Sequence, residues 1–137
     1  IIKEIETNIH TAEQKLNLNF MSTHPDNYSL LKGNRQRTEE IAKFEKESNN
    51  VSIKYIPKEN IGQMTDDEIK EGDIIAIVTA IEGLDVSHVG FAHWHGDTLH
   101  MIHASSTAGK VIDDSTPLAD YLAKRKSHLG IRIFRAL

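Results

Sequence analysis

The pair Gly96-Asp97, set between two strand-like runs, constrains the fold of this chain most. Residues 86–95 and 98–104 read as strands, and a Gly-X pair between them suits a type II′ turn. A two-residue turn also determines which residues face each other. Residue 95 then faces 98, and counting back pairs 93 with 100, 90 with 103 and 88 with 105. The sequence therefore predicts a tight antiparallel hairpin of known register.

This register predicts two histidines as neighbours on one face of the hairpin. Side chains alternate between the faces of a strand, so His88 and His103 share a face, and Gly90 leaves space opposite His103. Diagonal neighbours have Cα atoms roughly 7–8 Å apart, close enough for the two rings to meet. The same face carries Ala92, Trp94, Leu99, Met101 and Ser105. The other face carries Val89, Phe91, Ile102 and Ala104, with His93 and His100 near its far end.

Paired imidazoles suit proton transfer near neutral pH. Histidine has a pKa near 7, and a second polar group can hold the ring of the base in one tautomer. His88 as base with His103 as its orienting partner follows the logic of a nucleophile-base-orienter triad. The alternative is a structural pair of hydrogen-bonded histidines. The chain contains no cysteine, so it supplies no thiol nucleophile and forms no disulfide.

Other chemistries find weaker support in the sequence. Zinc favours imidazole ligands, but no carboxylate is evident to join His93, His95 and His100, so these histidines are interpreted as solvated residues near the hairpin tip. We predict neither a metal nor a cofactor. Ser105-Ser106 lacks the Gly-x-Ser-x-Gly elbow of serine hydrolases. A glycan hydrolase needs two converging carboxylates, and no spacing indicates such a pair.

The remaining elements predict one α+β domain with an antiparallel sheet over residues 1–137. A helix is expected over residues 2–16, from the spacing of Ile2, Ile5, Ile9, Ala12 and Leu16, and a second over 35–48 with Ile41 and Phe44 inward. Residues 19–34 read as a loop with a helical turn at 28–31. A capping box at Thr65–Glu68 predicts a short helix, and Thr116-Pro117 predicts the start of another. Further strands are expected at 51–55, before Pro57, at the buried run 74–78, and at 131–134.

Charge and hydropathy exclude two classes of partner. The net charge is −4, and Lys124-Arg125-Lys126 is the only basic block, which argues against a nucleic-acid binder. The longest apolar run, 74–78, is far shorter than the roughly 20 residues of a membrane span.

Several motifs resemble the NlpC-type, papain-like cell-wall amidases, and within them the N-acetylmuramoyl-L-alanine amidase-like branch. The core motifs are Gly72-Asp73 at a strand start, Ser87-His88-Val89-Gly90, and His103-Ala104-Ser105-Ser106. Residues 19–25, 55–58, 83–88 and 130–132 also match the pattern of that branch. The resemblance runs from about residue 16 to the end, and it implies a papain-like fold in which an antiparallel sheet or half-barrel packs against helices.

The resemblance implies a cysteine amidase that cuts the bond between N-acetylmuramic acid and L-alanine in peptidoglycan fragments. His88 would take the thiol proton and His103 would orient His88. Substrate contacts are expected from Asn19, Phe20, Ser22, His24 and Ser105. Such a substrate places the protein in the bacterial cell envelope, in the periplasm.

The cysteine of that family is missing from this chain. The family carries it at a helix N-terminus upstream of the motifs present here, and the sequence opens with Ile1-Ile2 rather than Met. We therefore expect the C-terminal part of a longer amidase, with the cysteine on an upstream segment of the same protein. The alternative is a homologue that binds peptidoglycan without cutting it; a zinc hydrolase or a glycan hydrolase would be further alternatives.

Overall fold

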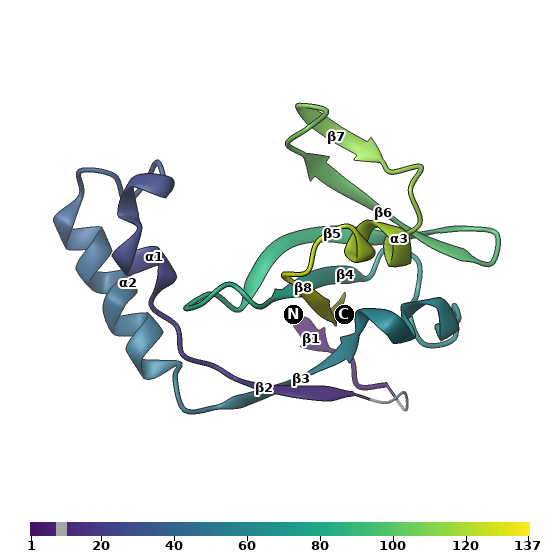
Figure 1. The fold of residues 1–137 in the computed structure, drawn as a ribbon, viewed down its shortest axis with the longest axis horizontal. Coiled ribbons are helices and arrows are strands. Elements are labelled where there is room, and N and C mark those ends of the chain that lie inside the picture. The colour runs from purple at the N-terminus through teal and green to yellow at the C-terminus, as the bar shows by residue number, and fades with distance from the viewer. Residues whose placement is uncertain (8–10) are drawn as a thin grey trace.

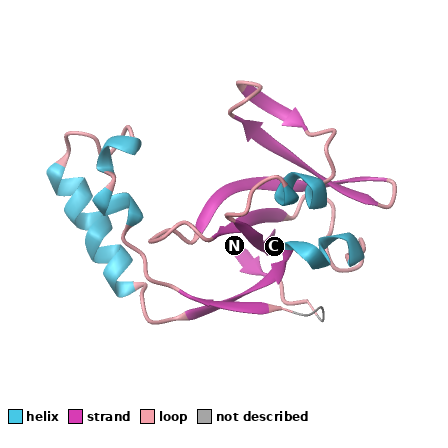
Figure 2. Cartoon of the chain, viewed as in Figure 1, coloured by secondary structure: helices cyan, strands magenta, loops and turns pink. Residues whose placement is uncertain are grey.

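The computed structural model describes residues 1–7 and 11–137 and shows an eight-stranded antiparallel sheet with a few short helices (Figures 1 and 2). The strand order is β2-β3-β8-β4-β5-β6-β7, and β1 also pairs with β8. The strands are β1 (Ile2–Glu4), β2 (Ala12–Lys15), β3 (Ser52–Pro57), β4 (Ile74–Thr79), β5 (Val86–His95), β6 (Thr98–Ser105), β7 (Lys110–Asp113) and β8 (His128–Ala136). The α+β class with an antiparallel sheet is confirmed.

The helices lie in two places. α1 (Phe20–Thr23), the 3₁₀ turn η1 (Pro25–Asn27) and α2 (Arg35–Glu47) form a helical arm that projects from one side of the sheet (Figure 1). η2 (Lys58–Gln63) and α3 (Leu118–Ala123) pack against each other and against the sheet. No described helix combines the length and the apolar character needed to cross a membrane.

The main core lies between the central strands and the α3–η2 layer. Ile75 and Ile77 of β4 are fully buried, as is Ile131 of β8, and Leu118 and Leu122 of α3 cover them. The predicted buried strand at 74–78 is therefore confirmed. An ion pair closes its start, because buried Asp73 accepts two 2.7 Å hydrogen bonds from Arg135.

The hairpin has the predicted turn and register. Gly96 has a φ of 62°, as the first position of a type II′ turn requires. The ladder between β5 and β6 runs from His95–Thr98 to Phe91–Ile102. The predicted pairs of residue 90 with 103 and 88 with 105 lie beyond it, where β6 continues beside β7 (Figure 1). The space over Gly90 is filled by Met101, whose side chain lies within 2.5 Å of where a Cβ at residue 90 would stand.

The predicted helix over 2–16 is wrong in the described residues. Residues 2–4 pair with β8 and residues 12–15 pair with β3, while Ile9 lies outside the residues that the structure describes. The sheet offers both segments unpaired backbone groups, and ladder hydrogen bonds there outweigh the weak helical spacing.

The helix predicted over 35–48 is confirmed, but its inward face is not the predicted one. Phe44 is 67% exposed, whereas Glu45 is buried. The Glu45 carboxylate accepts hydrogen bonds from the backbone N–H groups of Met21 and Ser22, both at 3.2 Å. A charged side chain is buried here because it caps the first turn of α1.

Smaller differences concern turns and one strand. The predicted short helix at Thr65–Glu68 is a single hydrogen-bonded turn, and α1 and η1 occupy part of the predicted loop. α3 begins at Leu118 with Pro117 as its N-cap, one residue later than predicted, and the Thr116 N–H donates to Asp114. β7 was not among the predicted strands.

Candidate active site

His88 and His103 meet on the predicted face of the sheet. His88 Nε2 of β5 lies 2.8 Å from His103 Nδ1 of β6, and the two ring planes are perpendicular. His103 is buried and His88 is half-buried. Their predicted proximity is therefore confirmed. The roles of base and orienting residue remain predictions.

A third member of this chain of hydrogen bonds, Asp114, was not predicted. Its Oδ2 lies 2.8 Å from His103 Nε2, and its Oδ1 accepts the backbone N–H of Thr116 at 2.9 Å. Asp114 directly follows β7, which pairs with β6 so that Ile112 faces His103. The signal in the sequence was a glycine turn at Gly109 followed by Val111-Ile112, which is typical of a short returning strand.

The three residues define which ring nitrogen of His88 keeps a free lone pair. An ionised carboxylate only accepts hydrogen bonds, so Asp114 requires a proton on His103 Nε2. His103 Nδ1 is then an acceptor and receives the Nε2 proton of His88. The lone pair of His88 is therefore on Nδ1, the nitrogen that is left to take a proton from a reacting group.

Electrostatics favour this arrangement of protons. Burial, followed by the proximity of His103 and His128, lowers the pKa of His88 below its usual value, which keeps the ring neutral and able to act as a base. Burial alone would raise the pKa of Asp114. The hydrogen bonds from His103 and Thr116 outweigh that effect and lower its pKa, so the carboxylate stays ionised.

The two histidines line a cleft of about 520 Å³. Tyr121 of α3 stacks against His88 and against His128 of β8. Exposed Lys124 and Arg125, just after α3, also line the cleft. Its further lining residues are Ser87, Ser105, Ser106, Thr107, Ala108, Ile112, Asp114 and Thr116. The cleft is large enough for a small substrate and presents a base, hydroxyl groups and cations to it.

The predicted substrate-binding residues separate into two groups. Ser105 lies in the cleft with His88 and His103, and its Oγ also accepts the backbone N–H of Ala108. Asn19, Phe20, Ser22 and His24 lie at α1 and are not among the residues that line the cleft. Their segment is attached to the β4–β5 loop by backbone hydrogen bonds from Asn19 and Phe20 to Gly83. Substrate contact by these four residues remains a prediction.

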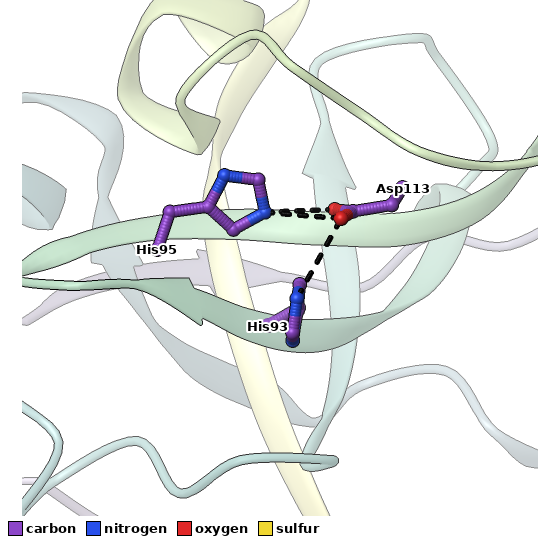
Figure 3. Close-up of side chains that lie close together, drawn as sticks. All are labelled: His93, His95 and Asp113. Carbon is purple, nitrogen blue, oxygen red and sulfur yellow. Dashed lines mark hydrogen bonds and ion pairs between the residues drawn. The ribbon is translucent and has the colours of Figure 1, made fainter.

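The histidines at the hairpin tip differ from the prediction. A carboxylate does stand beside them, because Asp113 of β7 lies 2.9 Å from His95 Nε2 and 3.6 Å from His93 Nε2 (Figure 3). His100 is buried rather than solvated, and its ring stacks on His95 at 3.7 Å between centroids. Asp113 was not predicted to lie here because its position depends on β7, which the sequence pattern did not predict.

Comparisons with known proteins show a family and several similar solved structures. The family model described as AmiA-like, N-acetylmuramoyl-L-alanine amidase-like, matches residues 1–131. A solved N-acetylmuramoyl-L-alanine amidase from Bacteroides uniformis is 32% identical with a TM-score of 0.86, over 98% of this chain and 56% of its own. A structure described as a putative xylanase from Bacteroides fragilis is 44% identical with a TM-score of 0.81, over 90% of this chain and 54% of its own.

The chain thus spans slightly more than half of the length of these solved proteins. No curated protein matched the chain.

Proposed function

The chain belongs to the N-acetylmuramoyl-L-alanine amidase-like family, and from this premise we propose that it carries the base of a cell-wall cysteine amidase of the NlpC-type, papain-like class. The observation that carries the proposal is the hydrogen-bonded series His88–His103–Asp114 in the wall of the cleft. The substrate is the amide between N-acetylmuramic acid and L-alanine in peptidoglycan fragments.

The proposed reaction uses a cysteine from a segment of the same protein outside this chain. His88 Nδ1 takes the thiol proton, and the thiolate attacks the amide carbonyl carbon. The tetrahedral intermediate collapses as His88 returns the proton to the leaving nitrogen, which releases the L-alanine amine and leaves a thioester. Water, deprotonated by His88, then attacks the thioester to release the muramic acid carboxylate and regenerate the thiol.

His103 and Asp114 serve in this reaction as positioning residues. They hold the His88 ring with Nδ1 free, and the charge of Asp114 favours the imidazolium that forms during the proton transfer. Burial of His103 keeps this hydrogen bond away from competing water.

The substrate fits the cleft by charge. The stem peptide of a muropeptide carries carboxylates, and Lys124 and Arg125 line one side of the cleft while Ser105 offers a hydroxyl. Asn19, Phe20, Ser22 and His24 are proposed as further contacts on the family pattern alone. The substrate class in turn suggests work in the bacterial cell envelope, in the periplasm.

The relative described as a putative xylanase raises glycan hydrolysis as a second candidate. That chemistry needs two carboxyl groups about 5–10 Å apart around the scissile bond. Among the described residues that line this cleft, Asp114 is the one carboxylate, and it is engaged by His103 and Thr116. The cleft therefore supports amide hydrolysis better.

A peptidoglycan-binding homologue without catalysis is the other candidate, and the absence of cysteine from the chain favours it. One experiment separates the three. The full-length native protein is incubated with a muropeptide, and the products are identified by mass spectrometry, with an intact-mass measurement to ask whether a cysteine-bearing stretch precedes Ile1. Release of a free L-alanine amine supports the amidase. A new reducing sugar end would support the glycan hydrolase, and binding without any product would support the binding module.

A further inference from the structure

A second cluster of potential ligands lies on the opposite face of the hairpin, apart from the proposed catalytic residues. His93 and His95 of β5 and Asp113 of β7 each offer one ligand atom, and these atoms all lie within 4.8 Å of one another (Figure 3). A tetrahedral zinc ion with bonds of about 2.0 Å separates its ligand atoms by about 3.3 Å. One oxygen of Asp113, Oδ2, lies 3.2 Å from His95 Nε2 and 3.6 Å from His93 Nε2, close to that value.

Neighbouring side chains hold both rings in place, and the contact of Glu71 with His93 is one that metal-binding histidines commonly make. Glu71 lies 2.5 Å from His93 Nδ1, and its other oxygen accepts the backbone N–H of Trp94. A carboxylate on one ring nitrogen directs the lone pair to the other, and His93 Nε2 faces Asp113. The ring of His95 is held by stacking on buried His100.

We propose that His93, His95 and Asp113 form a zinc-binding site, with Glu71 as the carboxylate that orients His93. Two imidazoles and one carboxylate are a ligand set that Zn²⁺ takes, with a fourth position left to water. The half-exposed position of the three side chains leaves that fourth position open to solvent.

The site would join two strands that do not pair with each other. β6 lies between β5 and β7, so a metal ion held by His93, His95 and Asp113 would tie β7 to β5 across it. Asp113 is adjacent to Asp114, and His100 bonds the Asp114 carbonyl oxygen at 2.8 Å. Bound zinc would thereby hold the end of β7 from which Asp114 reaches His103.

The test measures zinc uptake by the full chain in chelator-free buffer. Calorimetry is expected to show one Zn²⁺ per chain with a micromolar or tighter dissociation constant, and the melting temperature should rise with zinc concentration. Asp113→Asn and His95→Gln should each weaken binding at least tenfold. Glu71→Gln should weaken it about tenfold through the orientation of His93. Asp97→Asn, an exposed carboxylate at the same hairpin tip, is the charge-matched control and should bind zinc as the parent chain does.

The location is read from the ring-nitrogen NMR signals of the histidines. Zinc should shift the Nε2 signals of His93 and His95 and leave His88 unshifted. Uptake that shifts His88 and His103 instead, or that Asp113→Asn leaves unchanged, would overturn the proposal. So would the lack of saturable uptake at about 1 mM Zn²⁺.

Discussion

His88 Nε2 and His103 Nδ1 lie 2.8 Å apart with their rings at right angles, and this contact joins two strands, β5 and β6, whose ladder of paired residues ends at Phe91–Ile102. A side-chain hydrogen bond thus connects β5 and β6 beyond the last of their paired residues. Asp114 continues the series on the far side of His103. The geometry makes His88 Nδ1 the nitrogen with a free lone pair, and the first prediction rests on it.

Replacing His88 should remove catalysis without removing the fold. In the full-length protein, His88→Ala is expected to lower kcat for muropeptide cleavage by roughly 10³-fold or more, because it removes the proposed base. The dissociation constant for the muropeptide should change little. Cleavage and calorimetry measure the two quantities.

Val89→Ala is the matched control for this variant. Val89 is the next residue on β5, is 55% exposed and lies on the other face. The Val89→Ala variant should cleave the muropeptide at the parent rate. Retained cleavage in His88→Ala would refute the assignment of His88 as the base.

Asp114→Asn should impair catalysis through His103. The two oxygens of Asp114 accept two hydrogen bonds, from His103 Nε2 and from Thr116 N–H. An amide offers only one acceptor oxygen, so one bond is lost and the His103 tautomer is no longer determined. We expect kcat to fall about 10–100-fold with KM nearly unchanged.

The tautomer of His88 distinguishes a positioning role of Asp114 from a purely structural one. The ring-nitrogen signals of His88 should show a mixture of tautomers in Asp114→Asn and a single one in the parent chain. An unaltered His88 tautomer together with a reduced kcat would contradict the positioning role.

The hairpin shows which part of the candidate site can be predicted from the sequence alone. Gly96-Asp97 determines the register over five pairs, and alternation then places His88 and His103 on one face, so the central contact could be predicted from a turn and a period of two. The papain-like resemblance pointed to the same two residues. Neither source required a tertiary contact.

The residues that escaped prediction depend on contacts between distant segments. Asp114 is placed by β7, a four-residue strand that exists because β6 offers it a partner. Glu45 is buried because it caps a helix more than twenty residues earlier, which no periodicity of α2 reveals. Residues 2–4 are a strand because they pair with the end of β8 beyond its contact with β3, and residues 12–15 are a strand because they pair with β3.

Substrate charge gives a third prediction. Lys124 and Arg125 line the cleft, and each should attract a carboxylate of the stem peptide. Arg125→Glu is expected to raise KM for a muropeptide about tenfold, with a smaller effect at high salt because exposed charges are screened. Lys126→Glu makes the same charge change one residue outside the cleft lining and should leave KM near the parent value. Equal effects of the two variants would argue against a specific contact.

The ion pair of Asp73 with Arg135 gives a prediction about stability alone. Asp73 is buried, accepts two hydrogen bonds from Arg135 and also accepts the backbone N–H of Lys70. Asp73→Asn should lower the free energy of unfolding by about 2–3 kcal/mol, because a buried site loses its charge-assisted hydrogen bonds. Urea denaturation measures this, and exposed Asp67→Asn should change it by less than about 0.5 kcal/mol. A loss equal in both variants would show that the pair contributes nothing of its own.

Two histidines of the cleft, half-buried His88 and buried His128, make stability depend on pH. Burial is the largest cause that lowers the pKa of both His88 and His128 below 6.5 in the folded chain. The unfolded chain, free of that burial, takes up these protons near pH 6.5, so it binds more protons than the folded chain just below that pH. The contribution of these two histidines to the free energy of unfolding should therefore be at its maximum above about pH 6.5. It should fall as the pH drops toward their pKa values in the folded chain. Urea midpoints at about pH 7.5 and 5.5 test this, and His128→Gln should show a shallower decline of stability with falling pH.

The same pKa directions can be checked residue by residue in an NMR titration. His88 should titrate below 6.5, and His93, whose pKa is raised by its hydrogen bond to Glu71, should titrate above 6.5. The reverse order would contradict the assigned environments.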